Sequence, residues 1–235
     1  MIAVSKLSKT FGLRPVLRGV DLRIERAECV ALLGANGSGK TTLLRILAGL
    51  SRPTSGEARI GGWLLPKEAA QIRAHLGYLG HLPLIYDDLT AEENLRFFAR
   101  LYRTDAGHIP ALLERVGLAR RAKDRAGTFS RGMQQRLGLA RALLHAPDVL
   151  LFDEPYTGLD VDGAALLDSV IHEQREAGRT ILLTTHDLPR TLALCTRVVI
   201  LNRGVIMAQA PVASLTAGSL LELYTEAVGI RPGTL

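Results

Sequence analysis

Apolar and polar residues alternate in two segments near the start of the chain, Ile2–Leu7 and Val16–Ile24, as they do in half-buried β-strands. The next segment, Cys29–Leu33, is a continuous apolar run that ends at a glycine. Such a run is typical of a buried central strand that leads into a loop. Thr41–Leu50 then has a helical pattern that closes at glycine and proline breakers. The pattern predicts an antiparallel beginning followed by a strand–loop–helix unit.

The middle of the chain changes character, because helical periodicity replaces alternation. The predicted helices of this part are Leu89–Tyr102, Ile109–Val116 and Gly132–Leu144. Leucine-rich and β-branched strands then resume at Val149–Phe152, Thr180–Thr184 and Val198–Leu201, with a helix at Asp162–Ala177 between the first two. Alternation of strands and helices predicts an α/β fold with a mixed sheet core, an antiparallel β lobe and an inserted α-helical subdomain.

These segments predict one domain over residues 1–235. Its core lobe covers about 1–86 and 146–211, the helical insertion about 87–145, and a short helical tail about 212–235. The longest apolar stretches are interrupted well before about 18 residues, so we expect no membrane-spanning helix. The first residues lack the layout of a signal peptide, and we expect the protein to stay in the compartment where it is made.

One motif follows the predicted central strand and opens the next helix. The sequence Gly34-Ala35-Asn36-Gly37-Ser38-Gly39-Lys40-Thr41 fits the phosphate-loop pattern G-x-x-x-x-G-K-[ST]. Glycines let backbone N–H groups approach phosphate oxygens, and the helix places its positive end at the same point. We therefore expect ATP on Gly34, Asn36, Gly37, Ser38, Gly39, Lys40, Thr41 and Thr42, with the Thr41 hydroxyl on Mg²⁺.

Two further strands end in residues that suit phosphate chemistry. Asp153 and Glu154 follow the apolar strand Val149–Phe152, and His186 follows Thr180–Thr184. Ligands bind at the carboxyl ends of the strands in sheets of this kind. We expect Asp153 to hold Mg²⁺, and we expect Lys40, Glu154 and His186 to be catalytic, with Glu154 as the general base.

Net charge is +6, with basic runs around Arg96, Arg100 and residues 120–123. A nucleic-acid surface and a solvated basic face both remain open on charge alone. We take the solvated basic face as the interpretation and expect no nucleic-acid partner. Cys29 and Cys195 lie in apolar contexts without metal-ligand spacing, which indicates buried, reduced thiols.

The segment Phe129-Ser130-Arg131-Gly132-Met133-Gln134-Gln135-Arg136 precedes the acidic strand. With it, residues 1–210 resemble the ATP-binding subunit of an ATP-binding-cassette (ABC) transporter, a phosphate-loop NTPase. Arg131 stands where the family signature has its first glycine, and Met133 where it has glutamine. The resemblance implies that Ser130, Gly132 and Gln134 contact the ATP held by a second copy, in a head-to-tail dimer around two ATP molecules. It also implies that Phe11 stacks on adenine and that Gly158–Asp160 touch the opposite subunit.

The family has glutamine where this chain has His81. We expect His81 at the nucleotide or its Mg²⁺. The Gly80-His81 pair followed by Leu89-Thr90-Ala91-Glu92-Glu93-Asn94-Leu95 resembles the heme exporter ATPase of cytochrome c maturation. This implies an ATP-hydrolysing motor on the cytoplasmic face of the cell membrane, held there by integral membrane subunits.

Three other functions are alternatives to the heme exporter. The first is an ABC exporter of drugs, lipids or polysaccharides, whose motor subunit would carry the same motifs. The second is a soluble ABC ATPase that acts on ribosomes or repair complexes, which usually has two cassettes or a long coiled-coil insertion. The third is a nucleotide sensor without hydrolysis, which Glu154 and His186 argue against.

Overall fold

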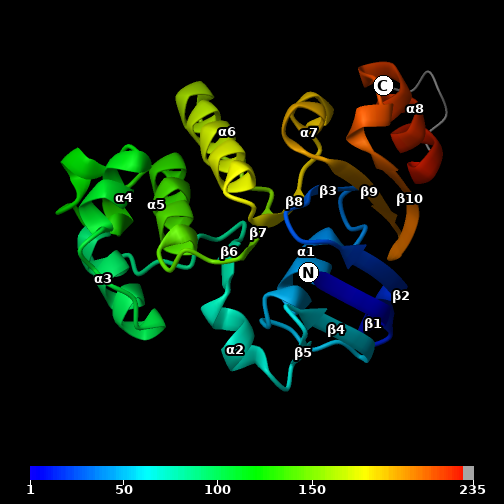
Figure 1. Ribbon diagram of the computed structural model, residues 1–235, viewed down its shortest axis with the longest axis horizontal. Helices are drawn as coiled ribbons and strands as arrows, with labels where there is room; N and C mark the ends of the chain where they lie inside the picture. Colours follow the sequence, from blue (N-terminus) through cyan, green and yellow to red (C-terminus); the bar gives the residue numbers. More distant parts are fainter. Residues whose placement is uncertain (230–235) are drawn as a thin grey trace.

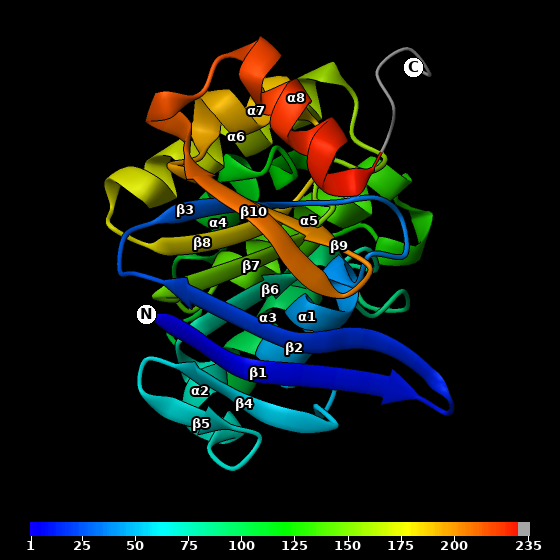
Figure 2. The ribbon, with the colours of Figure 1, turned by 90° about the vertical axis from the view of Figure 1, so that its right-hand side faces the viewer.

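The computed structural model describes residues 1–229 of the 235-residue chain, so the last six residues of the predicted tail lie outside it. The strands form two sheets (Figures 1 and 2). The smaller is antiparallel, with strand order β2-β1-β4-β5. Its strands are β1 (Ile2–Phe11), β2 (Arg14–Ile24), β4 (Ser55–Ile60) and β5 (Trp63–Leu65). This is the predicted antiparallel lobe.

The larger sheet has the order β10-β9-β3-β8-β7-β6 and is parallel except for the β10–β9 pair. Its strands are β3 (Cys29–Leu33), β6 (Leu76–Leu79), β7 (Val149–Asp153), β8 (Thr180–Thr184), β9 (Arg197–Asn202) and β10 (Val205–Pro211). Every residue of β3, β7 and β8 is buried, which explains why these strands are apolar without alternation. The predicted α/β class with a mixed sheet is confirmed.

Strand β3 divides two hydrophobic cores. Val30 and Leu32 pack with helix α1 (Lys40–Leu47) and the antiparallel sheet. The alternate residues Ala31 and Leu33 point into the other core, among the helices on the far face of the large sheet. The central strand is therefore covered on both faces, and its carboxyl end is held between the two cores.

The helical insertion lies at one side of the molecule, away from the antiparallel sheet (Figure 1). It contains α3 (Ala91–Tyr102), α4 (Ile109–Arg115), α5 (Arg131–Leu143) and the short turns η1 (Ala119–Arg121) and η2 (Ala126–Thr128). Helix α3 begins at Ala91 because Thr90 forms a capping box with Glu93. Helix α5 begins after Ser130, whose Oγ accepts a hydrogen bond from the Met133 N–H.

The remaining helices lie outside the insertion. They are α2 (Ala69–Ala74), α6 (Val161–Glu176), α7 (Leu188–Leu194), the turn η3 (Val212–Ser214) and α8 (Ala217–Val228). Asn202 Nδ2 donates to the Ala227 carbonyl at 3.0 Å and ties α8 to β9. In Figure 2, α8 lies above the β9–β10 pair. The predicted tail helix is present as α8 within the described residues.

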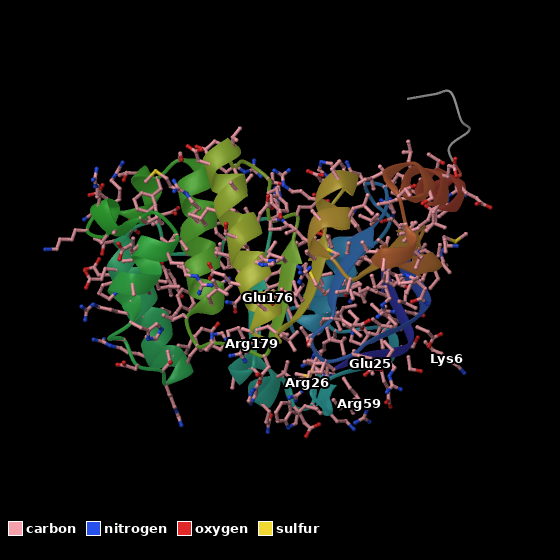
Figure 3. All side chains as sticks on the ribbon, turned by 45° about the horizontal axis from the view of Figure 1, so that its top comes forward. Lys6, Glu25, Arg26, Arg59, Glu176 and Arg179 are labelled. Atoms are coloured by element: carbon pink, nitrogen blue, oxygen red, sulfur yellow. The ribbon has the colours of Figure 1, made fainter. Side chains whose placement is uncertain are left out.

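Charged side chains of both signs mix on the surface. Figure 3 shows Glu25, Arg26 and Arg59 at one edge, where they line one shallow hollow. Arg59 pairs with Glu57 at 3.5 Å, and Arg96 pairs with Glu92 on α3. Each of these pairs places a basic side chain beside an acidic one at the surface.

Cys29 and Cys195 are buried free thiols whose Sγ atoms lie 3.8 Å apart. No helix among residues 1–229 is long and apolar enough to cross a membrane.

Candidate nucleotide site

The loop between β3 and α1 has backbone conformations that only glycine adopts easily. Gly34 has a φ of +153°, and a Cβ there would lie 2.1 Å from the Leu201 carbonyl oxygen. Gly39 has a φ of +111°, and a Cβ there would lie 2.8 Å from Leu17 Cδ2. Gly37 is also left-handed, with open space around it. The loop is thus pressed onto β9 and β2, and its curvature requires the glycines of the motif.

Lys40 is the first residue of α1, and its side chain is nearly buried. Its Nζ donates to the Gly34 carbonyl at 2.7 Å and to the Ala35 carbonyl at 3.3 Å. Burial lowers the pKa of Lys40, and the nearby charges of Glu154 and Asp153 oppose that change. Nζ is 3.9 Å from Glu154 Oε1. An ammonium has three donors, so one donor is left for a phosphate oxygen.

Asp153 is the last residue of β7 and is almost completely buried. Its Oδ1 accepts hydrogen bonds from Thr41 Oγ1 at 3.1 Å and Thr184 Oγ1 at 2.8 Å. Its Oδ2 is buried and has no hydrogen-bond partner. Burial is the main reason why the pKa of this carboxyl is raised. A buried carboxylate oxygen without a partner, next to a threonine hydroxyl, fits a hard cation that prefers oxygen ligands.

A cation bound here would have few ligands from the protein. Among residues 1–229 there is no group of three or more histidine, cysteine, aspartate or glutamate side chains spaced to hold a metal. Mg²⁺ is commonly bound by one or two carboxylates together with substrate phosphates and water. Asp153 and Thr41 fit that pattern. When bound, Mg²⁺ would neutralise negative charge on the phosphates.

Glu154 lies just beyond the end of β7 in a left-handed conformation, with a φ of +50°. Its N–H donates to Thr184 Oγ1 at 2.8 Å, which anchors the residue to β8. Its Oε2 is 3.1 Å from His186 Nδ1, while its Oε1 faces Lys40. The structure therefore brings the three predicted catalytic side chains together. A carboxylate held between a lysine and a histidine can accept a proton from water.

One pocket of about 730 Å³ joins these groups. It is lined by every residue from Gly34 to Thr42 and by His81, Glu154 and His186. All of these except Ala35 are candidate site residues from the sequence. The lining also includes four residues that the motifs did not indicate: Arg14, Val16, Thr157 and Tyr224. Tyr224 comes from α8, and burial raises the pKa of its phenol. No sequence signal linked this aromatic residue to the phosphate loop, because it lies in the tail, far from every motif.

Five predicted site residues lie outside that lining: Phe11, Ser130, Gly132, Gln134 and Asp153. Asp153 is still in contact with Thr41. Phe11 is 53% exposed at the end of β1, with Lys9 Nζ 4.7 Å from its ring centre. Gln134 Nε2 donates to the Ala126 carbonyl at 3.2 Å. Adenine stacking on Phe11 stays a prediction.

Ser130 and Gly132 belong to the start of α5, beside the loop that follows Glu154. A Cβ on Gly132 would lie 2.9 Å from the Gly158 carbonyl oxygen. Neither residue shares the pocket of the phosphate loop. Contact between them and an ATP molecule therefore stays a prediction that requires a second copy of the chain.

Comparison with known proteins identifies the family of the chain. Residues 17–157 match the family model described as "ABC transporter". This chain belongs to the ABC transporter family. It is an ATP-binding subunit of that family, an ATPase coupled to transport.

Curated relatives agree with this assignment. The ABC transporter ATP-binding protein NatA of Bacillus subtilis (strain 168) is 38% identical over 204 residues, which cover 85% of this chain and 83% of NatA. The Nod factor export ATP-binding protein I of Paraburkholderia xenovorans (strain LB400) is 37% identical, over 93% of this chain and 73% of that protein. The linearmycin resistance ATP-binding protein LnrL of B. subtilis is 32% identical, over 88% and 68%.

Solved structures show the same cassette. The ATP-binding subunit of an ABC transporter superposes with a TM-score of 0.88 and 32% identity, over 97% of this chain and 99% of the other. The cassette MJ0796, in a dimeric post-hydrolysis state bound to ADP and Pi, gives a TM-score of 0.84 and 27% identity, over 92% and 100%. The fold predicted for this ABC ATPase is confirmed.

Proposed function

We propose that two copies of this ABC ATPase close head to tail around two Mg-ATP molecules and that hydrolysis separates them. The observation that carries the proposal is the division of the site. Lys40, Glu154 and His186 meet in one pocket, while Ser130 and Gly132 lie outside its lining. A second copy would supply these two residues, at a helix start whose free N–H groups suit an anion.

The test of this dimer uses two variants. Glu154→Gln keeps the shape of the side chain and removes its basicity, so it should form an ATP-dependent dimer detectable by light scattering. Lys40→Ala should abolish phosphate release, since it removes the buried ammonium. A Glu154→Gln protein that stays monomeric at saturating Mg-ATP, alone and with its membrane partners, would contradict the head-to-tail dimer.

We also propose that the subunit works on the cytoplasmic face of the membrane, docked on integral membrane subunits. A groove lined by Leu50, Leu82 and Leu84 continues to Thr41 and Asp153. These leucines are 49%, 71% and 46% exposed, which is unusual for large apolar side chains that cluster on one surface. An apolar segment of a membrane subunit fits this groove and would lie next to the Mg²⁺ end of the site.

For the cargo, the resemblance of Gly80-His81 and Leu89–Leu95 supports heme handling for c-type cytochromes. Within this segment, His81 lines both the nucleotide pocket and the apolar groove. A strain that lacks the gene should lose covalently bound heme in c-type cytochromes and keep b-type cytochromes. The wild-type gene should restore them, and the Glu154→Gln gene should not.

The second candidate cargo is a drug, lipid or polysaccharide, and the similarity to exporter ATPases favours it. They include proteins of Nod factor export and of linearmycin resistance. If the deletion strain keeps its c-type cytochromes, heme handling is excluded. Increased sensitivity to membrane-active compounds in that strain would then support this second candidate.

A further inference from the structure

His81 and Arg131, two residues at which this chain departs from the family pattern, contact each other. Arg131 Nη2 lies 3.0 Å from His81 Nε2. A guanidinium is a donor only and keeps its charge, so Nε2 must be the acceptor. The contact therefore requires the imidazole tautomer that carries its proton on Nδ1. One departure supplies the donor and the other supplies the acceptor.

The stem of Arg131 makes a second contact, on the loop that follows Glu154. A Cβ on Gly158 would lie 2.8 Å from Arg131 Cδ and 2.9 Å from its Cγ. Gly158 is left-handed, with a φ of +81°, and its carbonyl is close to Gly132. The side chain of Arg131 thus runs along the Gly158 backbone before its guanidinium meets His81.

His81 lies at the end of the site where ATP would be hydrolysed, rather than at the end where adenine would bind. It lines the nucleotide pocket with Glu154 and His186. It also lines the apolar groove, whose wall includes Thr41 and Asp153, the two candidate Mg²⁺ ligands. A change in the position of this imidazole therefore bears on the phosphate that is cleaved.

We propose that Arg131 is a positioning residue for ATP hydrolysis. It holds His81 against the start of α5 and against the Gly158 loop, so that these three segments move together. The proposal depends on the ATPase activity that the family establishes, and not on the proposed cargo. A partner in the apolar groove that displaces Leu82 or Leu84 would pull on His81, and through Arg131 on the Gly158 loop.

The test separates the two contacts of Arg131. Arg131→Met keeps an unbranched stem on Gly158 and removes the donor, so kcat should fall about five-fold, as expected for one typical solvent-exposed hydrogen bond, and KM for ATP should stay unchanged. Arg131→Lys keeps a donor and should retain most of kcat. The matched control Arg100→Met removes an exposed arginine of α3 and should leave both constants unchanged.

A double-mutant cycle tests whether Arg131 acts through His81. In a His81→Ala background, Arg131→Met should cause no further fall in kcat. In a His81→Gln background it should still lower kcat, because the glutamine carbonyl can accept the hydrogen bond. An equal fall in the wild-type and His81→Ala backgrounds would overturn the proposal, and so would a wild-type kcat for Arg131→Met. Thermal unfolding of each variant reports separately whether the fold is intact.

Discussion

Asp153 has a buried acceptor oxygen, Oδ2, without a hydrogen-bond partner. We therefore expect Asp153→Asn to stabilise the nucleotide-free protein and to remove its response to Mg²⁺. In Asp153→Asn the side-chain Oδ1 can still accept from Thr41 and Thr184. The charged Oδ2, which is buried without a partner, is replaced by a neutral amide. The variant therefore changes the charge of the site while it keeps the hydrogen bonds at Oδ1.

Two effects set the magnitude. An unmade hydrogen bond at a buried acceptor costs about 1–3 kcal/mol. The amide NH₂ of the variant also needs a partner and the nearby Lys40 charge loses a counter-charge, so we expect the lower end, about 1 kcal/mol. For a domain of this length, 1 kcal/mol raises Tm by about 2–4 °C. The variant without nucleotide should melt at a Tm higher by that amount.

The assay is thermal unfolding without nucleotide, with ATP and a chelator, and with Mg-ATP. A ligand at 100 times its Kd stabilises by about 2.7 kcal/mol, so Mg-ATP should raise the wild-type Tm by roughly 5–10 °C. In Asp153→Asn the shift with Mg-ATP should be no larger than the shift with ATP and chelator. The control Asp148→Asn removes a carboxylate paired with His75 and Arg179 on the surface and should keep the full Mg²⁺ response.

Two results together would contradict this role of Asp153. These are a Tm of the nucleotide-free Asp153→Asn protein below that of the wild type, together with an unchanged additional shift on adding Mg²⁺. That outcome would mean that the carboxylate is stabilising in the free protein and is not the cation ligand.

Three further predictions follow from single contacts. Tyr224→Ala should raise KM for ATP about five-fold with little change in kcat, as the loss of one aromatic contact implies, and Tyr224→Phe should not. Gly34→Ala should abolish nucleotide binding measured by calorimetry, because its Cβ overlaps the Leu201 carbonyl, whereas Gly178→Ala, left-handed but in open space, should only lower Tm. Burial lowers the pKa of His145 to about 4, so the unfolded chain takes up a proton that the folded chain does not, and stability should fall by about 2 kcal/mol as pH drops from about 6.5 to 4. Urea unfolding of His145→Gln should show a weaker pH dependence over that range.

The main strands and helices could be predicted because their burial patterns are strong. The run Cys29–Leu33 is apolar since both of its faces are covered, and α3 starts where its capping box places it. Short elements of mixed composition were not predicted. Strand β6 contains Gly77, where a Cβ would lie 2.2 Å from the Ala142 carbonyl of α5. Close packing on α5 therefore requires glycine at this position, and the short strand has no strand-like sequence pattern. Strand β10 is only half-buried, so its sequence gives a weak signal for a strand. It is held as a strand by antiparallel pairing with β9.

The candidate site also contains residues that the sequence predicts and contacts that it does not. Residues close in sequence to the motifs were predicted, because the carboxyl ends of neighbouring parallel strands must meet. The contact between His81 and Arg131 joins residues 50 positions apart and depends on how the α5 start packs beside Gly158. Tyr224 depends on how α8 is tied to β9. Such contacts arise from tertiary packing, and no local pattern encodes them.

The position of β3 between two cores has a consequence for how the molecule unfolds. Val30 and Leu32 contribute to one core, and Ala31 and Leu33 contribute to the other. Neither core can lose its packing without exposing this shared strand, so the two cores should unfold together in a single calorimetric transition. Because β3 leads directly into the phosphate loop, nucleotide bound there should shift that one transition as a whole instead of protecting one lobe first.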